Sequence, residues 1–70
     1  MSAAHLELKY DLLRYHYLET QAWYYDAKSD LAEAQGNEME SCKYFDKMDE
    51  LLGQAIELKQ QLEERGVKVD

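Results

Sequence analysis

The chain has few of the residues that cross-link small proteins or shape their turns. Its 70 residues include one cysteine, no proline and three glycines. A single cysteine can form neither a disulfide framework nor a four-ligand structural zinc site. A chain this short buries only about 60% of its unfolded surface, so a lone core contributes little stability. Either the helices pack unusually well or the chain associates with another molecule.

Positive charge is scarce as well. The chain has 8 Lys+Arg against 15 Asp+Glu, a formal net charge of -7. Binding to nucleic acid or to an anionic membrane requires Lys and Arg, so we expect neither. No apolar run approaches the roughly 18 residues of a membrane span, and the first residues lack the pattern of a signal peptide. These features predict a cytoplasmic, soluble protein with a single domain over residues 1–70.

Apolar and small residues in the first half of the chain follow a heptad pattern. They recur in steps that alternate between four and three residues, which is typical of a helix with one packing seam. We therefore predict a helix over residues 4–34. The heptad face of this helix consists of Leu6, Tyr10, Leu13, Tyr17, Thr20, Tyr24, Ala27, Leu31 and Ala34.

A short break separates this helix from a second one. Gly36 suits the left-handed position that follows a helix end, and Asn37 with Glu40 three residues later resembles a capping box. A second helix is predicted over residues 38–65. Gly66 ends it, and residues 67–70 are expected to form a frayed tail.

Two helices of similar length joined by so short a loop must be antiparallel neighbours. The predicted fold is therefore an all-α hairpin. In this register Asp30 lies level with Lys43, and Asp26 lies level with Lys47. These opposite charges are expected to favour the register, although exposed pairs contribute only about 0–1 kcal/mol each.

Both helices carry more apolar surface than one hairpin contact can cover. The heptad face and a broad stripe on the second helix form the predicted hairpin or dimer seam, and the first helix has a second apolar face in its N-terminal half. Homodimerisation into a four-helix bundle would cover the excess. Whether the second face serves a homodimer or a foreign target is left open. The seam comprises Tyr10, Leu13, Tyr17, Tyr24, Leu31, Phe45, Met48, Leu52 and Leu62. The second face, predicted to bind a partner, comprises Leu8, Leu12, Tyr15, Leu18, Trp23 and Tyr25.

No residue pattern points to catalysis, a metal or a cofactor. His5 and His16 lie about 16 Å apart along a helix, too far to share one metal ion. General acid or base catalysis needs carboxylates held in a cleft, whereas the carboxylates of this chain fall on polar helix faces. We expect a protein that is not an enzyme, with no cofactor and no metal.

The unusual density of aromatic residues favours protein binding, because interfaces are enriched in Tyr and Trp. The leading hypothesis is an interaction protein that binds a larger protein and inhibits or adapts it. By analogy of size alone, such acidic helical proteins often come from phages and block a host protein. One alternative is an acidic DNA mimic that occupies the nucleic-acid site of a basic protein. Another is a purely structural dimerisation module. The acidic rim or mimic surface comprises Asp26, Asp30, Glu33, Asp46, Asp49, Glu50 and Glu57.

Overall fold

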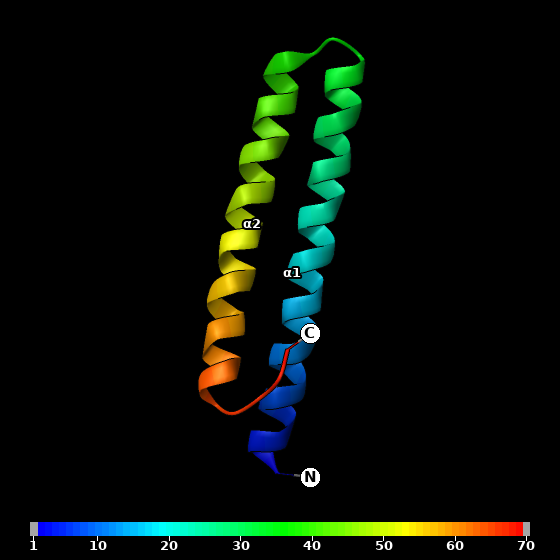
Figure 1. Ribbon diagram of the computed structural model, residues 1–70. Coiled ribbons are helices and arrows are strands. Elements are labelled where there is room, and N and C mark those ends of the chain that lie inside the picture. Colours follow the sequence, from blue (N-terminus) through cyan, green and yellow to red (C-terminus); the bar gives the residue numbers. More distant parts are fainter. Residues whose placement is uncertain (1, 70) are drawn as a thin grey trace.

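The computed structural model describes residues 2–69 and consists of two long helices. Helix α1 spans Ala3–Ala34 and helix α2 spans Glu38–Glu64, and they run antiparallel as one elongated hairpin of 51 × 20 × 16 Å (Figure 1). The predicted all-helical hairpin is confirmed, and all four predicted helix boundaries lie within one residue of the observed ones. Neither helix has the length and apolar character needed to cross a membrane.

The turn between the helices is set by glycine and asparagine. Gly36 has φ 78°, a left-handed conformation that a side chain would disfavour. Its N–H donates to the Glu33 carbonyl at 3.0 Å, and the Asn37 N–H donates to the Ala32 carbonyl at 2.8 Å. This pair of bonds is a Schellman motif, which satisfies carbonyls at the end of α1. The Asn37 side chain then accepts from the Glu40 N–H at 3.2 Å and caps α2, as predicted.

The segment after α2 folds back instead of fraying. Gly66 ends the helix with φ 80°, and the Val67 N–H donates to the Leu62 carbonyl at 3.0 Å. Val67 is half-buried and Val69 is buried against the core, so the prediction of a frayed tail is wrong for residues 67–69. Figure 1 shows this segment turning from the end of α2 toward α1. Its two valines bury apolar surface against the core. Asp70 lies outside the described residues.

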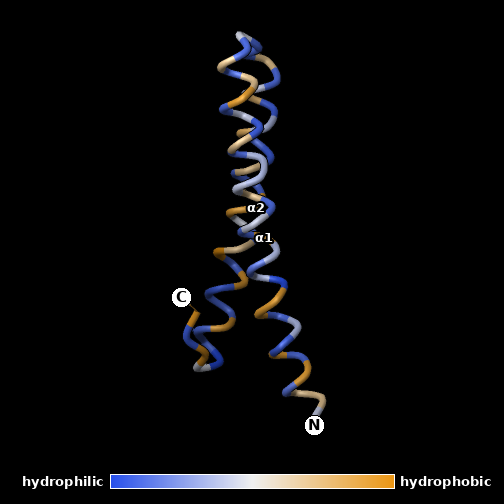
Figure 2. Tube along the Cα trace, turned by 90° about the vertical axis from the view of Figure 1, so that its right-hand side faces the viewer, coloured by the Kyte–Doolittle hydropathy of each residue, from blue (hydrophilic) through white to orange (hydrophobic). Residues whose placement is uncertain are grey.

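The apolar core lies at the end of the hairpin remote from the loop. Tyr15 and Leu18 of α1 pack there against α2, and Leu62 is fully buried. Beyond this contact the lower ends of the two helices diverge, as the side view shows (Figure 2). The buried members of this core are Tyr15, Leu18, Ala55, Leu58, Leu62 and Val69, with Leu8, Leu12, Leu51 and Val67 packed against them.

Small residues replace large ones in the half of the hairpin near the loop. Ala22, Ser29 and Ala32 are buried on α1. The Ser29 hydroxyl donates to the backbone carbonyl of Ser41 at 2.9 Å, and the two serine hydroxyls lie 3.0 Å apart. Such short bonds need a close approach of the helices, which small side chains permit.

One ion pair joins the far ends of the helices. The Arg65 guanidinium donates to the Asp11 carboxylate at 2.8 Å. The pairs expected at the other end, Asp30 with Lys43 and Asp26 with Lys47, are absent from the ion pairs of residues 2–69. Each residue turns a helix by about 100°, so the two aspartates face one side of the contact between the helices and the two lysines face the other. Residues at the same height along the hairpin are for this reason not in contact.

Replacing Leu62 by Ala tests whether the core at the open end supports the fold. The variant is expected to lose about 2–5 kcal/mol of unfolding free energy, because it removes the fully buried leucine and leaves a cavity. Urea denaturation followed by circular dichroism measures this loss. The matched control is Ile56→Ala, since Ile56 is 55% exposed on the same helix. Equal losses in both variants would contradict this placement of the core.

Candidate interaction surface

The heptad face of α1 is the main exposed apolar surface of the hairpin. Tyr10, Leu13 and Tyr17 are 64%, 60% and 61% exposed, and Tyr24 and Leu31 are also more than half exposed. These residues were predicted from the heptad pattern to form the hairpin or dimer seam. As a hairpin seam the assignment is wrong, because none of the five is buried against α2.

The second apolar face of α1 forms the hairpin contact instead. Tyr15 and Leu18 are buried in the core, while Leu8, Leu12 and Tyr25 are half-buried. These residues were predicted to bind a partner, and α2 already covers most of that surface. Trp23 is the exception, because it is 62% exposed.

Side-chain size and polarity explain this exchange of faces. Leucine buries its whole side chain without a polar atom to satisfy, whereas a buried tyrosine needs a partner for its hydroxyl. The second face supplies Leu8, Leu12 and Leu18 at the open end, and Ala22 and Ala32, which are also buried on α1, continue the contact toward the loop. A seam built on the tyrosine-rich heptad face would bury Tyr10 and Tyr17 at the open end, where each hydroxyl would need a polar partner.

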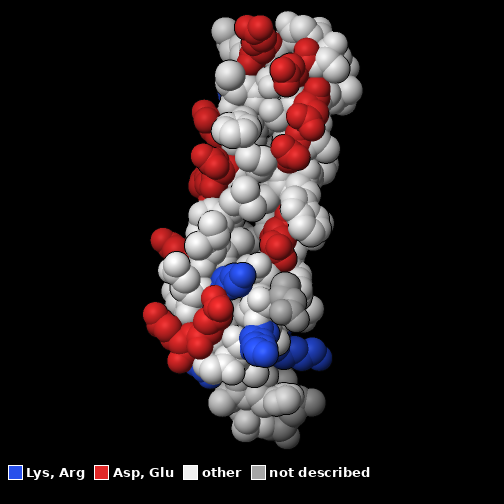
Figure 3. Space-filling view, viewed as in Figure 1, with Lys and Arg blue, Asp and Glu red and all other residues white. Residues whose placement is uncertain are grey.

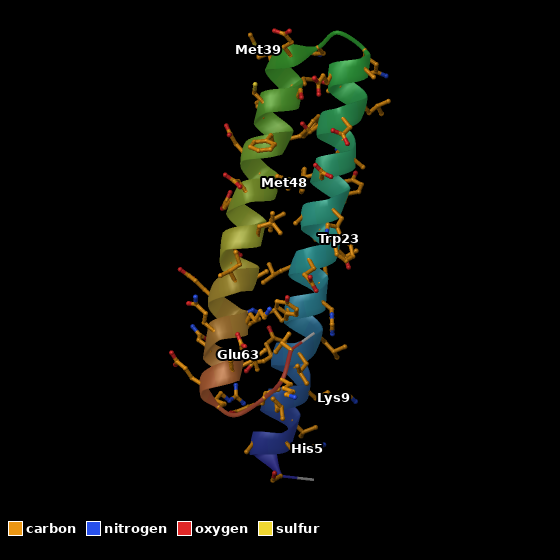
Figure 4. All side chains as sticks on the ribbon, viewed as in Figure 1. His5, Lys9, Trp23, Met39, Met48 and Glu63 are labelled. Atoms are coloured by element: carbon orange, nitrogen blue, oxygen red, sulfur yellow. The ribbon has the colours of Figure 1, made fainter. Side chains whose placement is uncertain are left out.

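The two faces lie on opposite sides of α1. With about 100° of rotation per residue, the heptad face is turned roughly half a circle from the residues that contact α2. Figure 4 shows Lys9 and Trp23 on the side of α1 away from α2, whereas Met48 of α2 points into the space between the helices. Helix α1 therefore has one neighbour and one uncovered apolar side.

The seam residues predicted on α2 divide by their position around the helix. Leu62 is buried, Met48 and Leu52 are half-buried, and Phe45 is 49% exposed at the edge of the contact. Ile56 is exposed near the same edge. The broad stripe of α2 is thus wider than the part that α1 covers.

A lysine lies among three tyrosine rings beside the heptad face. The Lys28 Nζ is 4.8 Å from the ring centroid of Tyr44, 5.0 Å from that of Tyr24 and 5.8 Å from that of Tyr25. Hydrogen bonding to Tyr24 raises the pKa of Lys28, so the ammonium form is favoured. This cluster was not predicted from the sequence, although the spacing of four between Tyr24 and Lys28 on a helix is a signal for part of it.

The acidic residues named from the sequence are all exposed. Asp26, Asp30 and Glu33 of α1 line one open hollow together with Asp46 of α2, next to the loop. Figure 3 shows acidic side chains along both helices in this half, with the basic side chains visible on this face nearer the other end. Asp49, Glu50 and Glu57 do not line this hollow, and Glu50 lies 3.7 Å from Lys47.

The histidines lie along one side of α1 beside leucines. His5 and His16 both line a shallow apolar hollow with Leu12 and Leu13. His16 Nδ1 is 3.6 Å from the Glu19 carboxylate one turn along the helix. Among residues 2–69, no group of three His, Cys, Asp or Glu side chains is placed to hold a metal ion.

The chain matches no known protein-family model, no curated protein and no solved structure. Its class is therefore defined by its own geometry, an antiparallel helical hairpin with an uncovered heptad face.

Tyr15, a buried residue of the core, predicts a loss of stability in alkali. Burial raises the pKa of Tyr15, and the carboxylates of Glu19 and Glu63 raise it further. The folded state thus favours the neutral phenol. This contribution is complete below the usual tyrosine pKa of about 10 and is lost as the pH rises through the raised value.

Tyr15→Phe, which cannot ionise, is expected to keep its helicity to a higher pH than the wild type. Circular dichroism between about pH 9 and pH 12 tests this. Tyr10→Phe is the control, since Tyr10 is 64% exposed, and its alkaline transition should coincide with that of the wild type. Identical transitions for all three proteins would show that Tyr15 ionisation does not limit stability.

Proposed function

We propose that the protein is a non-enzymatic protein–protein interaction module that docks another helix against the heptad face of α1. The observation that carries this proposal is the exposure of Tyr10, Leu13, Tyr17, Tyr24 and Leu31 along one side of a long helix. Apolar residues at this spacing form the seam by which helices pack side by side. A continuous apolar patch of this kind is typical of an interaction site.

The aromatic character of the face supports this proposal. Tyrosine offers a large contact area with few rotatable bonds and keeps its hydroxyl available at the rim of an interface. Trp23, 62% exposed, adds a second aromatic type beside the face. Homodimerisation is one form that such docking can take, and inhibition or adaptation of a larger protein is another. The cytoplasmic location and the lack of catalytic activity stay predictions.

Site-specific cross-linking in living cells tests the docking surface. Tyr17 is replaced by the photoreactive residue p-benzoylphenylalanine, and the cells are irradiated. We expect covalent adducts with protein, because Tyr17 lies at the middle of the proposed interface. The cross-linked peptides, identified by mass spectrometry, should map to a helix of the partner molecule.

Two controls accompany this experiment. The same photoreactive residue at Glu57, on the acidic outer side of α2, should give few adducts. Leu13→Glu and Tyr24→Glu, added to the Tyr17 variant, should abolish its adducts while leaving the helical signal, since both side chains are exposed. Equal adducts from positions 17 and 57 would refute the proposed function.

An electrostatic mimic of nucleic acid is the second candidate function. It is favoured by the four carboxylates of Asp26, Asp30, Glu33 and Asp46 that line one hollow near the loop. Carboxylates three or four residues apart on a helix lie about 5–6 Å from each other, near the spacing of phosphates along a strand. In this case the docking surface would be the acidic edge of the hairpin, and the partner would be basic.

The salt dependence of binding separates the two candidates. If the acidic edge carries the interaction, affinity for the cross-linked partner should fall roughly ten-fold or more between about 50 and 200 mM salt. Duplex DNA should then compete. If the heptad face carries it, affinity should change little with salt. The triple variant Asp26→Asn, Asp30→Asn, Glu33→Gln serves as the matched control, since it removes the charge and keeps the size.

A further inference from the structure

The heptad face is arranged symmetrically about the middle of α1. The helix spans Ala3–Ala34, so its midpoint lies between Leu18 and Glu19. A two-fold axis through this midpoint, perpendicular to the helix, generates a second helix running the opposite way. Every position of the heptad face then lies level with a position that belongs to the same face of the second copy, except that Ala34 meets Ala3.

The side chains that meet in this arrangement are complementary in size. Two of the three tyrosines come level with a small residue, which leaves room for the ring, and the leucines meet a leucine or the third tyrosine. Alternation of large and small residues across facing positions lets packed layers interdigitate. The level pairs are Leu6 with Leu31, Tyr10 with Ala27, Leu13 with Tyr24, and Tyr17 with Thr20.

The charges on one edge of the face are complementary too. Lys9, His16, Trp23 and Asp30 follow one another at seven-residue intervals along this edge. The two-fold axis brings Lys9 of each copy near Asp30 of the other, offset by about 3 Å along the helix. Lys9 and Asp30 are exposed, and within the described part of the chain neither takes part in an ion pair. Figure 4 shows Lys9 and Trp23 on the same side of α1.

The other edge repeats this complementarity. It carries Glu7, Arg14, Gln21 and Lys28 at the same seven-residue interval. The axis brings Glu7 of each copy near Lys28 of the other, and Arg14 near Gln21. Four opposite-charge contacts therefore arise from two kinds of pair, because the symmetry doubles each of them.

A parallel arrangement of two α1 helices lacks these contacts. In a parallel pair each residue of one edge lies beside the residue five positions later on the facing edge of the other copy. Lys9 would then lie beside Arg14, and Asp30 beside the uncharged Gln35. Tyr10 would also meet Tyr10 of the other copy. Like charges disfavour this orientation, so the edge residues select the antiparallel one.

From this complementarity we infer that the occupant of the heptad face is a second copy of the chain, with the two α1 helices antiparallel about the midpoint of α1. This inference rests on the proposed docking function and names its partner. Because the heptad face lies opposite the hairpin contact, the two α1 helices are central and each α2 lies outside. The assembly is a row of four helices and not the compact bundle expected from the sequence.

Sedimentation of the purified full chain tests the stoichiometry. Between about 1 and 100 μM protein, the mass should rise to twice the 8.3 kDa of one chain. Tyr17→Glu, at an exposed position, should return the protein to one chain while leaving it helical. A wild-type protein that stays at the mass of one chain throughout this range overturns the inference.

A charge exchange tests the pairing of edges. Lys9→Glu and Asp30→Lys should each raise the dimer dissociation constant roughly three- to thirty-fold, because each turns two attractive contacts into repulsive ones. The double variant restores opposite charges and should return to within about three-fold of the wild type. Lys43→Glu on α2 is the matched control and should have no effect. Failure of the double variant to recover overturns the assigned register.

Cysteine cross-linking tests the orientation. Leu6→Cys and Leu31→Cys are made separately in a Cys42→Ser background and oxidised alone or mixed. The antiparallel arrangement predicts a disulfide-linked dimer only in the mixture, since like positions lie about 40 Å apart. Disulfide formation by either variant alone indicates a parallel pair and overturns the inference.

The two proposals fail in different ways. Adducts from Tyr17 to a different protein, with the purified chain at the mass of one molecule, leave the docking function standing and remove the second copy as its occupant. An absence of adducts from Tyr17 in cells, with no dimer in solution, removes both.

Discussion

The contact between α1 and α2 decides which residues of this chain face solvent. One helix can give only one side to a single neighbour, and here Leu18 and Ala22 occupy that side on α1. Every residue half a turn away is left uncovered, whatever its hydrophobicity. The tyrosine-rich heptad face is therefore exposed because a better packing surface exists on the other side of the same helix. The exposed apolar face, which we propose as a docking surface, is a consequence of how the hairpin closes.

The charged side chains of this hairpin are distributed differently from its apolar core. The acidic groups gather along both helices toward the loop, and the Arg65–Asp11 pair lies at the far end. Exposed charges contribute little to the stability of the fold, but they govern which molecules approach and in which orientation. The edge residues Lys9 and Asp30 illustrate this division, since neither takes part in an ion pair within the described hairpin and, in the proposed dimer, together they discriminate between two orientations of the second copy. Apolar packing determines the shape of the hairpin, and in the proposed dimer charge determines the orientation of the second copy.

Local signals in the sequence were sufficient to predict the fold. Gly36 and Asn37 act on their own neighbours, so the turn and the limits of both helices could be read without knowing the tertiary structure. The faces could not be assigned in this way, because α1 carries apolar residues on two sides and periodicity does not rank them. The choice depends on side-chain size at Ala22 and Ser29, where the helices approach closely. The burial of Val69 was missed for a similar reason, since it depends on contacts distant in sequence.

The distribution of the core along the hairpin has a consequence for how the chain folds. Contacts near the loop close a short stretch of chain, which costs little entropy, but they bury only small residues such as Ala32. Contacts around Leu62 bury far more apolar surface, and they join segments that are separated by most of the chain. The end that is easiest to bring together is thus the weaker one. Helix pairing that begins at the turn gains most of its stabilisation only in its last steps, so partly zipped forms are poorly populated and the two long helices form as one cooperative unit.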